Sequence, residues 1–151
     1  MFTKQRFDNW ELKQSTLTGI ESLGWEHTTT VQRDTIPLAL AGHDVIGQAR
    51  TGSGKTGAFG VPIIEACQPT GNLQALILAP TRELANQVSV EMNNIQGDSG
   101  LKIATVYGGT DLEKQARQLG EGVDVIVGTP GRVMDMTKRN FIDLWVLIDV
   151  N

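Results

Sequence analysis

Apolar residues fall in short runs separated by polar stretches. Five runs have the length of a β-strand and are rich in Val, Ile, Leu and Ala: residues 45–49, 73–79, 101–107, 123–128 and 145–149. Between them, apolar residues recur every three or four positions, which indicates amphipathic helices. Strands that alternate with helices need crossover connections, which place the strands parallel in one sheet with helices on both faces. The pattern therefore predicts an α/β fold.

Two helices of this core are marked by their residues. The clearest apolar stripe consists of Leu84, Val88, Met92 and Ile95. These residues step by four, four and three positions along one helical face, so we expect the stripe to lie in the core. Another helix is predicted to begin at Thr129-Pro130, because threonine is a good N-cap and proline suits the first helical position.

Residues 1–42 are predicted to form a helical preface to the α/β core of residues 43–151. One helix carries Leu17, Ile20 and Leu23 at three-residue spacing. It is expected to stop at Gly24, which can adopt the left-handed conformation of a helix end. A second helix runs through Gln32 and should break near Pro37, since proline has no N–H to donate.

Composition and charge narrow the possible functions. The 151 residues suit a single domain, and 40% hydrophobic residues are enough for a core. The net charge of −4 is the wrong sign for wholesale binding of a polyanion, so any nucleic-acid contact must be local. The one cysteine, Cys67, is expected to be a small buried residue rather than a nucleophile. No apolar run approaches the ~18 residues of a membrane span, so we expect a cytoplasmic protein with no membrane contact.

The most informative segment is residues 49–56, Ala-Arg-Thr-Gly-Ser-Gly-Lys-Thr, which follows a predicted strand and opens a predicted helix. This is the setting of a phosphate-binding loop, where small residues let backbone N–H groups converge on phosphate oxygens. The expected nucleotide-binding residues are Thr51, Gly52, Ser53, Gly54, Lys55 and Thr56. Lys55 should reach the β and γ phosphates and the Thr56 hydroxyl should ligate Mg²⁺. The alternative is a glycine-rich turn with an incidental lysine, which the flanking strand and helix disfavour.

Further segments occur in the order typical of one family. Residues 24–32, with Phe7 seventeen residues before Gly24, resemble the adenine-reading Q motif of DEAD-box RNA helicases. Residues 49–56 resemble that family's motif I, 80–85 its motif Ia, 108–109 its glycine doublet and 129–132 its motif Ib. The resemblance implies a three-layer RecA-like P-loop domain, with a central, mostly parallel sheet covered by helices on both faces. It also implies ATP or ADP and Mg²⁺ as cofactors.

The resemblance gives two residues a role toward the base. It implies that the Gln32 amide pairs with the adenine edge, since an amide offers both a donor and an acceptor. It also implies that Phe7 stacks on the adenine. Trp25 stands where the family usually has phenylalanine, and Thr28 where it usually has proline, so this clamp departs from the family pattern.

The resemblance also implies RNA as a partner, bound through its sugar-phosphate backbone. The expected RNA-binding residues are Pro80, Thr81, Arg82, Gly108, Gly109, Thr129, Pro130, Gly131 and Arg132. They follow predicted strands, at the carboxyl edge where open α/β sheets bind ligands. The chain has few aromatic residues for a platform on which bases stack: three Trp, one Tyr and four Phe. Contacts to the sugar-phosphate backbone of the RNA are therefore favoured. For Arg82 or Arg132 alone, a solvated or ion-paired arginine is the alternative.

The end of the sequence departs from the family in its catalytic residues. Asp149 matches the first aspartate of the family's Asp-Glu-Ala-Asp box, so the resemblance implies a catalytic and metal-binding role for it beside Lys55 and Thr56. Val150 then stands in the place of the glutamate, and valine cannot act as a general base. The second helicase lobe is absent from these residues and is expected in the full-length protein.

We therefore expect an N-terminal ATP- and RNA-binding domain of a DEAD-box ATP-dependent RNA helicase, inactive in hydrolysis and unwinding as an isolated chain. A stand-alone, catalytically silent module that binds nucleotide or RNA is the main alternative. A different P-loop enzyme, such as a small-molecule kinase, is a third, but it would need neither the Q-motif residues nor the segments around Arg82 and Arg132.

Overall fold

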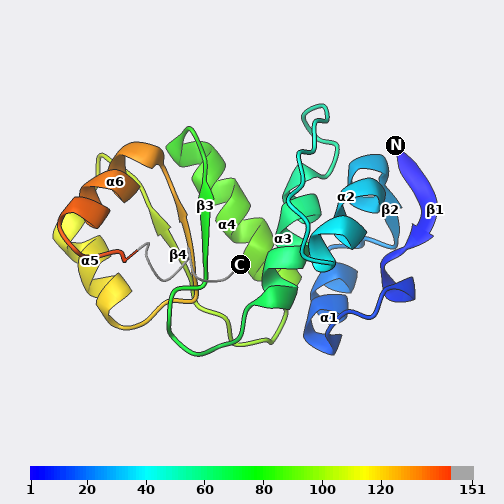
Figure 1. Cartoon of the computed structure of the whole chain (residues 1–151), viewed down its shortest axis with the longest axis horizontal. Coiled ribbons are helices and arrows are strands. Elements are labelled where there is room, and N and C mark those ends of the chain that lie inside the picture. Colours follow the sequence, from blue (N-terminus) through cyan, green and yellow to red (C-terminus); the bar gives the residue numbers. More distant parts are fainter. Residues whose placement is uncertain (144–151) are drawn as a thin grey trace. The chain divides into compact units, whose positions relative to one another are not determined.

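The computed structural model describes residues 1–143, which form two compact units (Figure 1). Unit 1 comprises Met1–Ala66 and Glu91–Gly100, and unit 2 comprises Cys67–Val90 and the residues from Leu101 onwards. Helix α4 (Arg82–Gln96) contributes residues to both units. The prediction of one domain over residues 1–151 stays a prediction. No helix in the described part of the chain is both long and apolar enough to cross a membrane.

Unit 2 contains a parallel three-stranded sheet. Its strands are β3 (Ala75–Leu78), β4 (Ile103–Val106) and β5 (Val125–Gly128), in the order β3-β5-β4. Leu78 and Val106 both pair with Gly128, so all three strands end at the same edge. The structure thus confirms three of the five predicted strands and their parallel arrangement.

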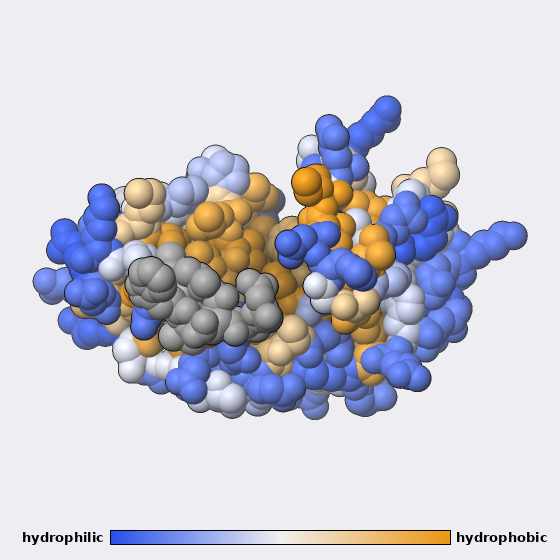
Figure 2. Space-filling view, viewed as in Figure 1, coloured by the Kyte–Doolittle hydropathy of each residue, from blue (hydrophilic) through white to orange (hydrophobic). Residues whose placement is uncertain are grey.

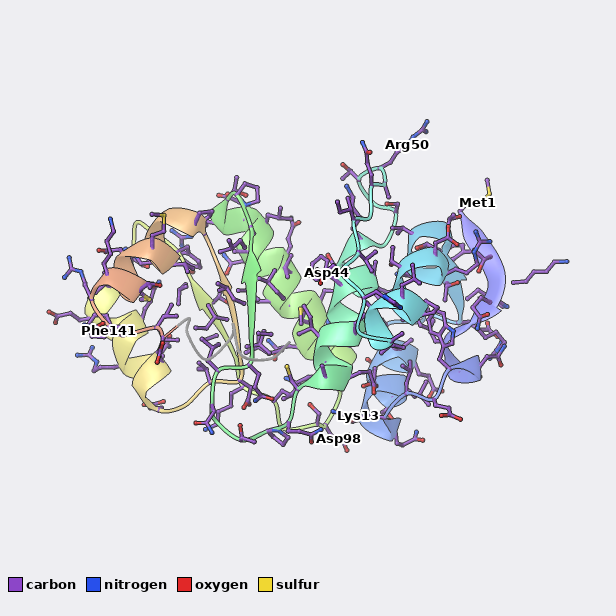
Figure 3. All side chains as sticks on the ribbon, viewed as in Figure 1. Met1, Lys13, Asp44, Arg50, Asp98 and Phe141 are labelled. Atoms are coloured by element: carbon purple, nitrogen blue, oxygen red, sulfur yellow. The ribbon has the colours of Figure 1, made fainter. Side chains whose placement is uncertain are left out.

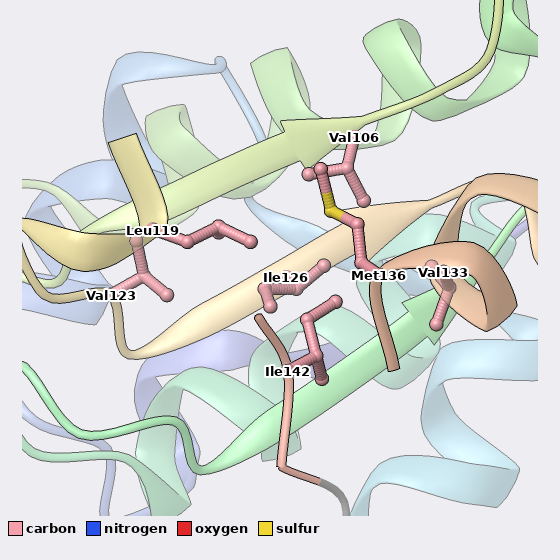
Figure 4. Close-up of a cluster of buried hydrophobic side chains, with 7 residues drawn as sticks. All are labelled: Val106, Leu119, Val123, Ile126, Val133, Met136 and Ile142. Carbon is pink, nitrogen blue, oxygen red and sulfur yellow. The ribbon is translucent and has the colours of Figure 1, made fainter. Parts of the chain in front are cut away.

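Helices cover both faces of this sheet. Helices α5 (Leu112–Gly120) and α6 (Pro130–Lys138) pack on one face. The core there consists of Val106, Leu119, Val123, Ile126, Val133, Met136 and Ile142 (Figure 4). The preceding residue of β4, Thr105, points to the opposite face, where its hydroxyl hydrogen-bonds that of Ser89 on α4. These layers confirm the α/β fold class with helices on both faces.

The buried stripe of α4 differs by one residue from the prediction. Ala85, Val88, Met92 and Ile95 are all at most 4% exposed, whereas Leu84 is 39% exposed. The buried residues step by three, four and three, which keeps them within one face of a 3.6-residue helix. Leu84 lies four residues before Val88 on the same side of the helix, but it stands in the first turn of α4 and is exposed there, so the prediction that it is in the core is wrong.

A buried carboxylate joins loops at the amino edge of the sheet. Asp124 is 1% exposed and precedes β5. Its Oδ1 accepts hydrogen bonds from the N–H groups of Thr70, at 3.0 Å, and Gly71, at 2.7 Å. Its Oδ2 accepts one from the N–H of Lys102 at 2.8 Å. Asp124 therefore holds the loop before β3 and the start of β4 together, at the edge away from the strand ends.

Unit 1 contains three helices, all of which the sequence predicted, although the expected break in one of them does not occur. Helix α1 (Gln14–Ser22) is followed by Gly24 at φ +73°, and α3 (Lys55–Ala66) begins within the phosphate-loop segment, as predicted. Helix α2 (Thr30–Leu40) runs through Pro37, where a break was expected. Proline removes one hydrogen bond, but the helix continues because the N–H of Ala41 still donates to the Pro37 carbonyl at 3.1 Å.

The strands of unit 1 differ from the prediction. Strand β1 (Phe2–Arg6) pairs antiparallel with β2 (His27–Thr29), a pairing that the largely polar sequence did not predict. The 3-10 turn η1 (Phe7–Asn9) follows β1. The predicted strand 45–49 has no regular structure, because a strand needs a hydrogen-bonded neighbour and no strand among residues 1–143 pairs with it. The predicted strand 145–149 lies outside the described residues.

Candidate nucleotide and nucleic-acid sites

The phosphate-loop segment of unit 1 folds as a tight turn that leads into α3. Gly52 and Gly54 have φ values of +77° and +86°, which L side chains rarely adopt. The N–H of Ser53 donates to the Arg50 carbonyl at 3.2 Å, and the Ser53 hydroxyl donates to the same oxygen. Arg50 is labelled on this loop in Figure 3, and Figure 2, in the same view, shows hydrophilic atoms projecting from the surface there. Glycine is thus required at two positions of the turn.

The start of α3 provides the groups that a phosphate needs. The helix begins at Lys55, whose side chain is exposed, and Thr56 is half-buried. N–H groups of a first helical turn have no acceptor within the helix, and the helix dipole favours an anion there. The structure therefore brings all the predicted loop residues, from Thr51 to Thr56, to one helix N-terminus. Their role in binding nucleotide stays a prediction.

Gln32 ties the start of α2 to this loop. Its side chain is only 2% exposed. Its Oε1 accepts a hydrogen bond from the N–H of Thr29 at 2.9 Å, which completes a capping box, and its Nε2 donates to the Gly54 carbonyl at 3.1 Å. A Cβ on Gly54 would lie 2.5 Å from Nε2. The amide has a second N–H and a second oxygen lone pair, but the side chain is buried, so pairing with adenine would require the residues around it to give access.

Phe7 lies among tryptophans rather than at an open surface. Its ring stacks on Trp25 at a centroid distance of 6.0 Å and meets Trp10 edge-on at 5.9 Å. The residue is 2% exposed. A pocket of about 520 Å³ lies beside Phe7 and Trp25, lined also by residues of α1. Stacking of adenine on Phe7 stays a prediction, and it requires the tryptophans to move because Phe7 offers no ring face to a base here.

In unit 2, the predicted RNA-binding residues follow the carboxyl ends of the three parallel strands. Residues 80–82 follow β3, 108–109 follow β4 and 129–132 follow β5. The Arg82 guanidinium lies over the Tyr107 ring, 4.7 Å from its centroid, which is a cation–π contact. The structure therefore brings the segments from motifs Ia and Ib and the glycine doublet to one sheet edge, as the sequence predicted.

Arg132 is held by two groups of the neighbouring elements. Its Nη1 donates to the Gln115 Oε1 at 2.9 Å, and its Nη2 donates to the Thr110 carbonyl at 3.1 Å. A guanidinium has five N–H donors, so three remain for a further acceptor. Neither partner carries a charge, so these contacts differ from the ion pair that was the alternative for this residue. The charge and the remaining donors suit contact with a phosphate.

Gln115 and Tyr107 also lie at this edge, although neither residue was predicted from the sequence to contribute to it. Gln115 is 8% exposed and lies on the apolar face of α5, which Leu112 and Leu119 share with it at helical spacing. A polar residue at a position that the periodicity buries is a signal that could have singled it out. Tyr107 directly follows β4, at the end of a predicted strand.

The predicted metal and catalytic residues are only partly described. Thr56 lies at the start of α3, whereas Asp149 and Val150 fall outside the described residues. Among residues 1–143, no three His, Cys, Asp or Glu side chains gather as they would around a metal ion. The Mg²⁺ site at Thr56 and Asp149 therefore stays a prediction. Cys67 is 3% exposed, which confirms the buried position expected of it.

Comparison with protein families gives a match over most of the chain. The family described as DEAD/DEAH box helicase matches residues 29–149. The chain belongs to the DEAD/DEAH box helicase family. Among curated proteins, it is 46% identical over 139 residues to the "DEAD-box ATP-dependent RNA helicase CshA" of Bacillus subtilis (strain 168). That alignment covers 91% of this chain and 28% of the relative. It is also 46% identical over 134 residues to the "RNA helicase CrhR" of Synechocystis sp., covering 86% of this chain and 27% of that protein.

Solved structures of the family share the fold. The crystal structure of a DEAD box protein from the hyperthermophile Methanococcus jannaschii matches with a TM-score of 0.88 and 40% identity, over 93% of this chain and 39% of that one. A hypothetical ATP-dependent RNA helicase from Sulfolobus tokodaii matches with a TM-score of 0.79 and 38% identity, over 88% of this chain and 38% of that one. These matches confirm the RecA-like fold, and the chain spans less than a third of the curated relatives.

Proposed function

We propose that this chain is the N-terminal ATP- and RNA-binding domain of a DEAD-box ATP-dependent RNA helicase, and that by itself it neither hydrolyses ATP nor unwinds RNA. Family membership supports the helicase class. The observation that carries the nucleotide role is the loop of residues 51–56, where two glycines with positive φ lead into a helix N-terminus. The activity of the whole protein requires a second, C-terminal RecA-like lobe, which we propose for the full-length protein.

The loop fits a nucleotide phosphate chain in both shape and charge. Gly52 and Gly54 open the backbone, the first turn of α3 offers N–H donors, and the exposed Lys55 supplies a positive charge. We propose that Gln32 reads the adenine edge, since it already contacts this loop through the Gly54 carbonyl. The second N–H and the second oxygen lone pair of the amide would then pair with the base.

Mg²⁺ fits the same loop through the hydroxyl of Thr56, a hard oxygen ligand, with Asp149 as the second residue expected to hold it. When bound, the ion neutralises charge on the phosphates. Hydrolysis needs a further group that activates water, and Val150 occupies the place of the glutamate that does so in the family. Loss of a general base lowers a rate about 10²- to 10⁴-fold, which supports negligible turnover by this chain.

RNA is proposed to contact the carboxyl edge of the unit 2 sheet through its backbone. Arg82 and Arg132 are the cations that this edge presents among the predicted residues, and backbone contacts carry no sequence information directly. Because the edge has few cations, we expect weak binding whose affinity depends little on salt. The logarithm of the binding constant falls with the logarithm of the salt concentration with a slope of about −0.7 for each phosphate neutralised on a single strand.

Calorimetric titration of the chain with ADP and with GDP tests the nucleotide role. We expect weak binding of ADP, little or none of GDP, and loss of ADP binding in Lys55→Ala. Lys4→Ala is the matched control, because Lys4 is also an exposed lysine of unit 1 but lies on β1. Equal binding of both nucleotides would refute adenine recognition. Unchanged ADP affinity in Lys55→Ala would refute the phosphate-loop assignment.

A further inference from the structure

Gln115 is a buried amide whose polar contacts all fall on the candidate RNA edge. Its Nε2 donates to the Tyr107 carbonyl at 3.2 Å and to the Thr110 hydroxyl. Its Oε1 accepts the hydrogen bond from Arg132 at 2.9 Å. The two N–H donors and the oxygen of the amide are thus all used. Because the side chain is 8% exposed, rotation would leave buried polar groups without partners.

The loop after β4 depends on this amide for its position. Gly108 and Gly109 are exposed, and a Cβ on either glycine would meet nothing within 4 Å. Side-chain packing therefore does not fix the two glycines. The loop is held instead at its ends, where the Thr110 hydroxyl donates to the Tyr107 carbonyl at 3.0 Å and Gln115 contacts both residues.

Arg132 is fixed by the same arrangement. Its fork donates to Gln115 and to the Thr110 carbonyl, and the latter belongs to the loop that Gln115 holds. An arginine side chain has several rotatable bonds, so an unrestrained guanidinium loses conformational entropy when it binds a phosphate. Two anchored nitrogens reduce that loss and leave the remaining donors to point in a fixed direction.

We propose that Gln115 is a positioning residue for RNA binding, which sets the guanidinium of Arg132 and the loop of residues 107–110 in place for contact with the RNA backbone. Gln115 acts through Arg132 and does not itself touch RNA. This inference rests on the proposed function, because it requires Arg132 to bind a phosphate.

The test measures how the affinity for RNA depends on salt. The chain is titrated into a labelled single-stranded oligouridylate at salt concentrations between about 50 mM and about 200 mM. The slope of the logarithm of the binding constant against the logarithm of the salt concentration reports the number of phosphates neutralised. Gln115→Met keeps the length of the side chain and removes its hydrogen bonds. Gln118→Met is the matched control, since Gln118 is an exposed glutamine one turn along α5.

We expect Arg132→Ala to reduce the slope by about 0.7 and the affinity about fivefold near 0.1 M salt, the contribution of one phosphate. Gln115→Met should reproduce most of that reduction, and the double variant should add nothing to Arg132→Ala alone. Gln118→Met should match the wild type. The affinity for ADP should stay unchanged in every variant, which a general loss of structure would not allow.

The outcomes separate this inference from the proposed function. An unchanged slope in Arg132→Ala refutes RNA binding by Arg132. A reduced slope in Arg132→Ala beside a wild-type slope in folded Gln115→Met overturns the positioning role of Gln115. If thermal unfolding shows that Gln115→Met does not fold, Gln115→Asn replaces it. It keeps the amide but is one methylene too short to reach all three partners, so a wild-type slope in Gln115→Asn would overturn the inference equally.

Discussion

Replacing Gln32 by glutamate tests the contact between α2 and the phosphate loop. Gln32→Glu keeps the shape of the side chain and an oxygen to accept the N–H of Thr29. It replaces the Nε2 donor, which now lies 3.1 Å from the Gly54 carbonyl, by an oxygen. When the new carboxyl is ionised, two oxygens face each other in a position that is 2% exposed. When it is protonated, its O–H can donate to the same carbonyl.

The magnitude follows from the lost hydrogen bond and from the buried charge. The hydrogen bond to the Gly54 carbonyl contributes about 1 kcal/mol net. Burial and the facing carbonyl should raise the pKa of the new carboxyl above the usual range of a glutamate, so that ionising it costs about 2 kcal/mol. Because the folded-state pKa is the higher one, stability falls as pH rises from the ordinary pKa of a glutamate, about 4.3, through the raised one, and then levels off. We expect a total loss of about 3 kcal/mol at pH 7 and a smaller one at pH 4.

Urea denaturation across this pH range measures the effect as the difference in unfolding free energy from the wild type. Gln118→Glu is the control, because Gln118 is exposed and its new carboxyl keeps an ordinary environment. The difference should grow with pH for Gln32→Glu and stay near zero for Gln118→Glu. A Gln32→Glu chain as stable as the wild type at pH 7, or a loss that does not depend on pH, would refute the contact with Gly54.

Two further predictions concern packing and charge in single elements. A Cβ on Gly19 would lie 2.2 Å from a backbone oxygen of α4, so Gly19→Ala should lower the unfolding free energy by about 2 kcal/mol although alanine has the better helix propensity. A Cβ on Gly120 would meet nothing within 4 Å, so Gly120→Ala should leave the unfolding free energy unchanged or raise it by up to about 1 kcal/mol. Thermal unfolding of both variants measures the difference, and equal stabilities would contradict the close approach of the helices. Hydrogen bonds from Arg6 lower the pKa values of Asp8 and Glu26, so their contribution to holding β1 is present above about pH 4 and is lost as pH falls through the lowered values. The protection factors of the β1–β2 amides, which compare the observed exchange rates with the intrinsic rates at the same pH, should therefore fall in acid. An Arg6→Gln chain with the same fall would exclude the ion pairs as its cause.

The sequence predicted those parts of the fold that hydrophobic periodicity encodes. The parallel strands of unit 2 and helices α1 and α4 carry apolar residues at the spacing of their element, and they form as expected. Helices α3 and α6 also form as expected, but they were predicted from the phosphate-loop segment and from Thr129-Pro130. The antiparallel pairing of β1 with β2 joins largely polar segments that are separated in the chain by η1 and α1, and no local pattern reveals such a pairing. Helix α2 passes Pro37 because packing and later hydrogen bonds outweigh one missing donor.

The candidate sites show a similar division. Residue types placed the phosphate loop at a helix N-terminus and the RNA-facing segments at one sheet edge. They did not show that the amide of Gln32 is engaged by Gly54, or that Phe7 is enclosed by Trp10 and Trp25. These contacts arise from the packing of segments distant in sequence. Gln115 escaped notice because its role lies in three hydrogen bonds that only the folded chain brings together.

Two-dimensional amide NMR spectra test the central claim most directly, because they report each ligand's site residue by residue. The chain is titrated with Mg²⁺·ADP and, separately, with oligouridylate. We expect ADP to shift amide signals of residues 29–32 and 51–56, and RNA to shift those of residues 80–82, 107–110 and 129–132. Absence of ADP shifts in residues 51–56, or RNA shifts confined to other parts of the chain, would contradict the account of a nucleotide loop and an RNA-binding sheet edge.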